Sequence, residues 1–189
     1  ADGCIIVSQH ADSTGAPSAC QEALDAGTTV YCVGYNVDML AVAPTAALTS
    51  PTNVWEVFYE YAFNAVMNGE SFDTNWSQGY EADAVKLTPL GESCAPGTQE
   101  KVDETIAAIK DGSLHVFDTS KFTVGGEAVT TAPVDLTYYD YSTGSPVAVY
   151  QGETKEAISD GYFHEGELRA APTFSLRIDG IIEDADPVA

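Results

Sequence analysis

The spacing of apolar residues predicts alternating strands and helices over the first part of the chain. The run CIIVS (4–8) is continuously apolar and β-branched, which is typical of a strand buried on both faces. Segment 15–27 carries apolar residues on one helical face, with Pro17 in its first turn and Gly27 at its end, so it predicts a helix. Segment 28–36 predicts the next strand. Strand, helix and strand in this order predict a βαβ unit with parallel strands.

Further along, the pattern goes on alternating between the periods of strands and helices. Segment 40–50 includes another extended stretch. Segment 53–69 repeats apolar residues every three or four positions and predicts a strong amphipathic helix. Segment 80–90 alternates apolar and polar residues, as a half-buried strand does. Segment 97–112 predicts a second clear helix, with Lys110 in its last turn.

The remainder of the chain has shorter apolar runs. Segment 114–118 predicts a strand, and 121–131 predicts a hairpin with a Gly-Gly turn. Segment 138–153 is rich in turn residues. We expect a short helix within 154–163 and a last strand over 174–182.

Polar side chains follow the first two predicted strands, at the point where each strand ends. His10, Asp12 and Ser13 follow the strand 4–8, and Asn36 and Asp38 follow the next strand. In an open parallel sheet, ligands bind beyond the carboxyl ends of the strands. The sequence therefore predicts a binding edge that is neutral to acidic and rich in hydrogen-bonding groups.

Each of these residues also has a purely structural interpretation. Asp12 and Ser13 are residue types that cap helices, and a helix is predicted to follow them. His10 fits an ordinary loop histidine, and Asn36 fits a turn residue that tolerates left-handed geometry. Trp55 and its aromatic neighbours on the helix 53–69 fit core packing at least as well as ligand contact.

Charge and cysteine content exclude several classes of partner and cofactor. The chain has 29 acidic and 7 basic residues, a net charge of −22, so nucleic acid and anionic membranes are poor partners. The four cysteines lack zinc-binding spacing, and we expect no metal site and no cofactor. The cysteines are Cys4, Cys20, Cys32 and Cys94. They fit either buried thiols or one or two disulfides.

Catalysis fits the sequence less well than binding. His10, Asp12 and Ser13 are the residue types of a hydrolase triad, but contiguous turn residues do not easily align nucleophile, base and orienting acid. The chain contains no nucleophile elbow, phosphate-binding loop or zinc-protease motif. We therefore expect no catalytic residue, and a small hydrolase using His10 and Asp12 is the enzymatic alternative.

Several motifs, in order, resemble the basic membrane protein family of ABC-transporter substrate-binding lipoproteins, which includes purine nucleoside receptors. They are QHADSTG, VGYNVDM, ALTSPTNVWEVFYEYAFNAVMNGE, WSQGYEADAVKLTPLG, HVFDTSKFTVGGEAV and DGYFHEGELRAAPTFSLRIDGI. The resemblance implies an α/β fold of the type I periplasmic-binding-protein kind, a parallel sheet with flanking helices. It also implies that the fold is incomplete, with the amino-terminal lobe largely missing. The start of the chain inside an apolar strand agrees with that expectation.

In a fold of this kind the chain crosses a hinge between two lobes. The resemblance places a second-lobe βαβ segment at 1–50. It places a hinge crossing with a first-lobe helix and strand at 51–85, and a return to the second lobe at 86–189. The crossings would lie at Thr49–Ser50 and near 80–87.

The resemblance also implies a ligand and a set of contacts. Nucleoside receptors have an aspartate where this chain has Asn36, and a lysine where it has Asn53, so a purine-like base fits better than a ribose-anchored nucleoside. The implied ligand-binding residues are His10, Asp12, Ser13, Asn36, Asp38 and Trp55.

The implied biology is transport outside the cell. We expect a non-enzymatic, membrane-anchored extracellular lipoprotein that captures a purine nucleoside or base and passes it to an ABC permease. Its other expected partner is a missing amino-terminal segment or a second copy of the chain. A sensor domain for a similar small ligand is the alternative.

Overall fold

The computed structural model describes residues 3–73, 76–142, 144–166, 168 and 176–182. The chain divides into two compact units, Ala1–Asp111 and Gly112–Ala189, which are described separately below. The first unit is of the α/β class: its described residues form a three-stranded parallel sheet and three α-helices. The α/β class and the parallel sheet expected from the sequence are thus confirmed.

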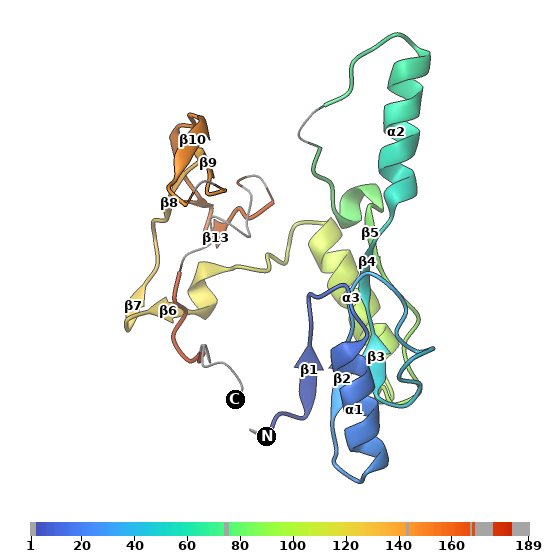
Figure 1. Cartoon of the computed structure of the whole chain (residues 1–189). Helices are drawn as coiled ribbons and strands as arrows, with labels where there is room; N and C mark the ends of the chain where they lie inside the picture. Colours follow the sequence, from blue (N-terminus) through green and yellow to red (C-terminus); the bar gives the residue numbers. More distant parts are fainter. Residues whose placement is uncertain (1–2, 74–75, 143, 167, 169–175, 183–189) are drawn as a thin grey trace. The chain divides into compact units, whose positions relative to one another are not determined.

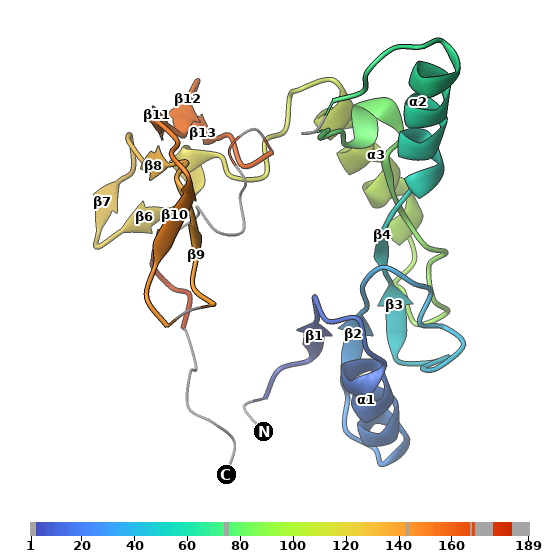
Figure 2. The same cartoon turned by 45° about the horizontal axis from the view of Figure 1, so that its top comes forward.

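The parallel sheet of the first unit has the strand order β1-β2-β3. These strands are β1 (Ile6–Ser8), β2 (Tyr31–Val33) and β3 (Ala47–Thr49). Helix α1 (Gly15–Asp25) joins β1 to β2 and lies beside β2 in Figures 1 and 2. The predicted βαβ unit is therefore confirmed.

The core of the first unit lies between α1, the sheet and the turn after β2, and it is built from small residues. Its buried members are Cys20, Val30, Cys32, Met39, Ala43, Ala46 and Ala47. Val7 packs against this core from β1, whereas Ile6 on the opposite face of the strand is 55% exposed. The prediction that 4–8 is buried on both faces is therefore wrong, because β1 is an edge strand with only one covered face.

Strand β3 continues through Ser50 into β4 (Pro51–Asn53), and the hydrogen-bonding partner changes at that point. The Gly34 amide donates to the Thr49 carbonyl on one side of the junction. Beyond it, β4 pairs antiparallel with β5 (Val85–Leu87). β4 and β5 run from the parallel sheet toward the helix that follows β4 (Figures 1 and 2).

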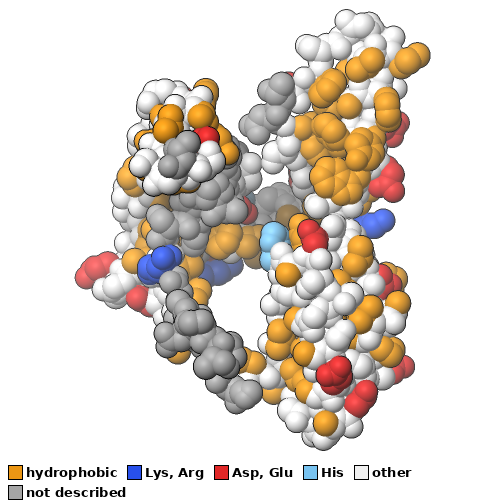
Figure 3. Space-filling model, viewed as in Figure 1, with side chains coloured by type: hydrophobic (Ala, Val, Ile, Leu, Met, Phe, Trp, Pro, Cys, Tyr) orange, Lys and Arg blue, Asp and Glu red, His pale blue; other side chains and the backbone are white. Residues whose placement is uncertain are grey.

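The two long predicted helices are confirmed as α2 (Trp55–Met67) and α3 (Thr98–Lys110). One face of α2 packs its rings against those of the segment after it, including Trp76. A second face of α2 is exposed and apolar, and Figure 3 shows apolar side chains gathered over this helix. The exposed stripe, spaced four residues apart, consists of Trp55, Tyr59, Phe63 and Met67.

The strand predicted over 80–90 forms only in part. Its first residues make a 3₁₀ turn, η1 (Tyr80–Ala82), which ends at Asp83 with a φ of 54°. β5 occupies the middle of the predicted range. The turn breaks the alternation early, so the pattern overestimated the length of the strand.

The second unit consists of two-stranded antiparallel ladders and one 3₁₀ turn, with no α-helix among its described residues. Its core holds Ala132, Val134, Ala157, Ile158, Phe163 and Leu168. The elements are η2 (Thr119–Lys121), β6 (Thr123–Val124), β7 (Glu127–Ala128), β8 (Pro133–Asp135), β9 (Tyr138–Asp140), β10 (Val147–Tyr150), β11 (Thr154–Glu156), β12 (Ile158–Ser159) and β13 (Tyr162–Phe163).

The predicted Gly-Gly hairpin is confirmed. It consists of β6 and β7, and its two turn residues, Gly125 and Gly126, have φ values of 63° and 82°. A two-residue turn that matches the right-handed twist of its flanking strands requires positive φ at both positions.

Three other predictions in this half are wrong. Segment 114–118 contains only an isolated bridge at Asp118. The helix expected within 154–163 is replaced by β11 and by a hairpin of β12 and β13, because Asp160-Gly161 forms a positive-φ turn. Residues 176–182 form a turn rather than a strand, and 174–175 lie outside the described residues.

Carboxylates hold the turns of the second unit. Asp179 accepts hydrogen bonds from the Thr123 hydroxyl at 2.6 Å and from the amides of Gly125 and Gly126 at 3.0 and 2.8 Å. These bonds, the hydroxyl first, lower the pKa of Asp179. A carboxyl whose pKa is lowered by folding adds stability above its ordinary pKa, and this stability is lost as the pH falls through the lowered value.

We therefore expect the hairpin of β6 and β7 to loosen in acid and on loss of the Asp179 charge. Asp179→Asn should speed amide hydrogen exchange over 123–128 at neutral pH. The unsubstituted protein should show the same change below about pH 4, after correction for intrinsic exchange. Asp160→Asn is the matched control, because the Asp160 carboxylate has no described hydrogen bond and asparagine tolerates its positive φ. Equal protection in the Asp179 and Asp160 variants would contradict this account.

The first unit has a tight contact where β2 ends. A methyl group on Gly34 would collide with the Ser50 hydroxyl and with the Met39 side chain, both of which are buried. Gly34→Ala should lower the free energy of unfolding by about 1–3 kcal/mol, as overpacking of a core does. Gly15→Ala is the control, since its added carbon would meet only the Ser13 hydroxyl at 3.7 Å. Urea titration of both variants measures the difference, and equal midpoints would refute the predicted collision.

Candidate functional site

Two of the polar residues predicted to share one edge, Asp12 and Asn36, do meet at the carboxyl ends of β1 and β2. The Asn36 side-chain amide donates to Asp12 Oδ1 across 3.4 Å, a long hydrogen bond between residues from different strand ends. The His10 imidazole lies against the Tyr35 ring, with centroids 4.2 Å apart and planes tilted by 39°. We call His10, Asp12, Tyr35 and Asn36 the polar edge.

The backbone of Asn36 is held by β4. Its φ of 67° is left-handed, which asparagine tolerates better than most residues. Its amide donates to the Pro51 carbonyl at 2.8 Å, and its own carbonyl accepts from the Thr52 hydroxyl at 2.6 Å. Asn36 is therefore a turn residue, as the structural interpretation expects, and its side chain is also positioned at the polar edge.

Ser13 makes its hydrogen bond at this strand end through its backbone. Its carbonyl accepts a hydrogen bond from the Gln9 side-chain amide at 2.8 Å. The residue before the first turn of α1 is Thr14, and no side-chain hydrogen bond caps the helix. The helix-cap interpretation of Asp12 and Ser13 is therefore wrong, and the Asp12 carboxylate contacts Asn36 instead.

Asp38 has a local structural role. Its Oδ1 accepts the backbone amide of Leu40 at 2.8 Å, which closes the turn after β2. One carboxylate oxygen is thus engaged by the turn itself.

Trp55, the last of the predicted site residues, is the first residue of α2 and is 54% exposed. It lines a hollow of about 260 Å³, which we call the aromatic hollow. The other lining residues are Asn53, Val54, Phe58, Trp76, Ser77, Gln78 and Ala84. Aromatic walls with side-chain amides at the rim suit a planar ligand that also makes hydrogen bonds.

One strand connects the aromatic hollow to the polar edge. Thr52 of β4 holds Asn36 at the polar edge, and Asn53, the next residue, lines the aromatic hollow. A second hollow of about 400 Å³ adjoins, because it shares Trp55, Phe58 and Trp76. The structure thus places Trp55 beside β4, but no described contact joins it to His10, Asp12 or Asn36.

Sequence reasoning missed three residues of this region: Tyr35, Trp76 and Gln78. The Tyr35 ring lies against His10, and the place of Tyr35 directly before Asn36 at a strand end was the available signal. Trp76 lies in a polar segment far from any periodic pattern. Its ring contacts with Phe58, at 5.3 Å between centroids, and with Tyr61, at 6.5 Å, bring it to the hollow.

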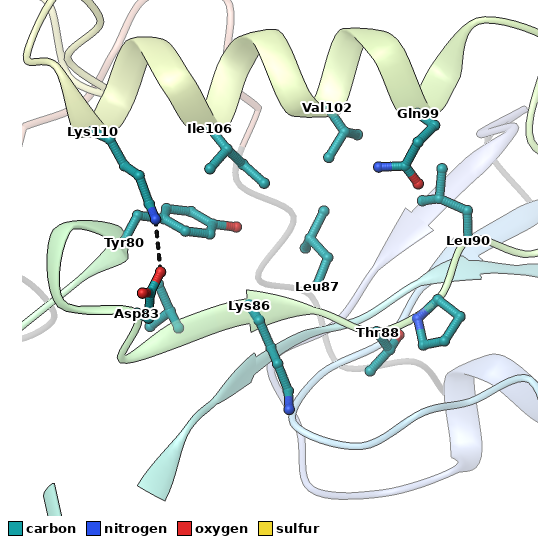
Figure 4. A pocket seen from close by; sticks show the side chains of 12 residues that line it. Tyr80, Asp83, Lys86, Leu87, Thr88, Leu90, Gln99, Val102, Ile106 and Lys110 are labelled. Carbon is teal, nitrogen blue, oxygen red and sulfur yellow. Dashed lines mark hydrogen bonds and ion pairs between the residues drawn. The ribbon is translucent and has the colours of Figure 1, made fainter. Parts of the chain in front are cut away.

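A further hollow of about 720 Å³ lies between β5 and α3 and contains none of the predicted site residues. Figure 4 shows Val102 and Ile106 pointing down from the helix toward Leu87, with the Tyr80 hydroxyl directed between them. The ion pair of Lys110 and Asp83, at 2.7 Å, lies at one end. Burial raises the pKa of Tyr80. This hollow is mainly apolar, with the Gln99 side-chain amide in its lining, and it has no tryptophan wall like that of the aromatic hollow.

The hydrolase alternative finds no support at the polar edge. Among the described residues, no hydrogen bond or ion pair joins His10 to Asp12. In the second unit, Ser159 Oγ and His164 Nε2 lie 2.7 Å apart, and the His164 ring stacks on Tyr162. This pair is exposed on a hairpin and lines none of the hollows described above.

Two other kinds of site are absent from the described part of the chain. No cluster of three or more His, Cys, Asp or Glu side chains is arranged there to hold a metal ion. None of the described helices combines the length and apolar character that a membrane crossing needs.

Comparison with known proteins places the chain in no family. No family model matches it, and no curated protein matches it. Among solved structures, it is similar to one described as a transcriptional activator of the comK gene from Bacillus halodurans. The two share 17% sequence identity and a TM-score of 0.47, over 59% of this chain and 38% of that chain. A likeness this distant carries no argument about function.

The resemblance to the basic membrane protein family is therefore corrected. The absence of any matching family model and of any matching curated protein overturns it. The physical reason lies in the motifs. Stretches such as QHADSTG and VGYNVDM are what strand ends and turns commonly require, namely small, polar and turn-forming residues. Unrelated α/β chains can share them.

The two roles of Asn36 can be separated by substitution. Asn36→Gly keeps the left-handed backbone and removes the amide, so stability should change by less than about 0.5 kcal/mol. Asn36→Ala should cost about 1 kcal/mol or more, because alanine keeps the β-carbon that is strained at this φ and loses the polar side chain that offsets the strain. Urea unfolding followed by tryptophan fluorescence reports on the first unit, where both tryptophans lie. An alanine variant as stable as the glycine variant would contradict the backbone role.

Proposed function

We propose that this chain is part of a non-enzymatic protein that binds a planar, hydrogen-bonding heterocycle of the purine type, either as the free base or as its nucleoside. The observation that carries the proposal is the meeting of His10, Tyr35, Asn36 and Asp12 at one sheet edge. An amide and a carboxylate offer both donors and acceptors, and the rings offer stacking surfaces.

Charge favours a neutral ligand over a phosphorylated one. No lysine or arginine lies among the residues that line the polar edge or the aromatic hollow. Asp12 contributes a carboxylate, and the chain as a whole carries a net charge of −22. A nucleotide would bring phosphate into this negative field, so we expect bases and nucleosides to bind more tightly than nucleotides.

The antiparallel pair of β4 and β5 supports a two-lobed arrangement. These strands join the parallel sheet to α2. β4 begins directly after the first predicted crossing, Thr49–Ser50, and β5 lies within the second, near 80–87. A type I periplasmic-binding fold that closes over the ligand is the finer proposal for this architecture. In that arrangement the polar edge and the aromatic hollow flank one strand and approach the same ligand.

The wider biology stays a prediction. We propose that the protein works outside the cell as a membrane-anchored lipoprotein and delivers its ligand to an ABC permease; a sensor for the same ligand is the alternative. We expect a partner that covers this unit, either an amino-terminal segment or a second copy of the chain. Exposed apolar surface supports this expectation. Ile6 on β1 and the outer face of α2 are exposed.

Calorimetric titration of the full chain with adenine, guanine, their nucleosides and adenosine monophosphate tests the proposal. Asn36→Gly, His10→Ala and Trp55→Ala should each weaken binding of the preferred base about 5- to 100-fold, the range for loss of one desolvated contact. Phe63→Ala is the matched control, because Phe63 lies on the exposed face of α2 and lines neither hollow beside Trp55.

Three results would count against binding at this site. They are unchanged affinity in all three site variants, an equal loss in Phe63→Ala, and tightest binding by the nucleotide. Conversion of adenosine to adenine during the titration, seen by chromatography, would instead favour the hydrolase alternative.

A further inference from the structure

Strand β5 pairs with β4 on one side only, so its other side is an edge. The Thr88 amide donates to the Ser50 carbonyl just beyond the end of this antiparallel ladder. Hydrogen-bonded pairs recur at every second residue of such a ladder, and the residues between them direct their backbone groups away from the partner strand. Val85 and Leu87 therefore direct their amides and carbonyls outward, away from β4.

These outward groups have no partner in the described part of the chain. No described hydrogen bond joins the amide or the carbonyl of Val85 or Leu87 to a residue outside β4. Because backbone groups need hydrogen bonds, an edge of this kind either faces water or pairs with a further strand. We call the outward groups of Val85 and Leu87 the free edge of β5.

Apolar surface lies next to the free edge. The side chains of Val85 and Leu87 share one face of β5 and line the hollow of about 720 Å³ below α3. Val102 and Ile106 line the same hollow from the helix (Figure 4). No residue of α3 is buried, although the helix has an apolar side. A strand added to the free edge would supply the packing that this side lacks.

The opposite face of β5 carries a positive charge. Lys86 points away from α3 in Figure 4, it is exposed, and none of the described ion pairs includes it. The first unit has three lysines and no arginine, and all three lie on β5 or α3: Lys86, Lys101 and Lys110. A carboxylate on an added strand, opposite Lys86, would be attracted to it.

The same charge disfavours pairing between two copies of β5. The two-fold antiparallel register that uses both Val85 and Leu87 puts Lys86 of one copy opposite Lys86 of the other. Like charges directly opposite each other in a ladder are destabilising. A different, acidic segment therefore fits the edge better than a second β5.

We propose that the free edge of β5 binds an extended segment of another polypeptide by strand addition, with apolar side chains at every second position and a carboxylate opposite Lys86. The backbone of that segment exchanges hydrogen bonds with Val85 and Leu87, and its apolar side chains enter the hollow below α3. This hollow shares no lining residue with the aromatic hollow, so the inference is independent of the proposed ligand.

The test uses the full chain and a blocked pentapeptide of threonine, valine, glutamate, valine and threonine. In residue-resolved NMR, titration with this peptide should shift the signals of 85–87 and of α3. It should also slow amide exchange at Val85 and Leu87, which exchange freely without peptide. The Lys86 amide faces β4 and is the internal control, so its exchange should change little.

Modified peptides separate strand addition from other binding. N-methylation of both valines removes one set of alternate amides, and N-methylation of the glutamate and the last threonine removes the other. One set should weaken binding about tenfold or more and the other should leave it nearly unchanged, because only alternate amides face the edge. Lysine in place of the glutamate should weaken binding about two- to fivefold, and Lys86→Glu should reverse that preference.

Four results would overturn the inference. They are an absence of shifts at 85–87 with millimolar peptide, slow exchange of Val85 and Leu87 in the dilute protein alone, and equal losses with the two methylated peptides. The fourth is exchange at these amides that slows with rising protein concentration in the absence of peptide, which would assign the edge to a second copy.

Discussion

The first unit depends on one strand that changes partners. Residues 47–53 run without a break through β3 and β4, and they are hydrogen-bonded first to β2 and then to β5. At the junction, Ser50 is fully buried, and its hydroxyl has no hydrogen-bond partner among the described residues. An unpaired buried hydroxyl costs free energy. Gly34 lies so close to the Ser50 hydroxyl that even a β-carbon on residue 34 would collide with it.

That strand also explains why binding groups gather where they do. The partner change leaves the end of β2 beside β4, so the backbone of Asn36 finds its hydrogen bonds at Pro51 and Thr52. The left-handed turn that results carries the Asn36 side chain toward Asp12 on the neighbouring strand end. The polar edge is therefore a consequence of backbone hydrogen bonding, and its side chains do little to stabilise the fold.

The two units are stabilised in different ways. The first packs small apolar residues, including Cys20 and Cys32, between a helix and a sheet. The second has short ladders, and its turns are closed by carboxylates such as Asp179 and Asp118, which accept amide and hydroxyl hydrogen bonds. Part of the large negative charge thus has a structural role, because an ionised carboxylate is a strong acceptor in a turn.

The sequence by itself determined the long, strongly periodic elements and the edge at which polar residues collect. The helices at 53–69 and 97–112, the βαβ unit and the Gly-Gly turn follow from local spacing and from residues that favour one backbone geometry. The same reasoning brought Asn36 and Asp12 to one edge. Local signals misled at 154–163, where Asp160-Gly161 was a hairpin turn, and at Asp12 and Ser13, which do not cap α1. Tertiary structure alone decided that β4 leaves the parallel sheet to pair with β5, that Trp76 meets Trp55 at one hollow, and that Cys20 and Cys32 share one buried core. Those contacts join residues distant along the chain, and such contacts depend on packing and hydrogen-bond satisfaction, which local periodicity does not encode.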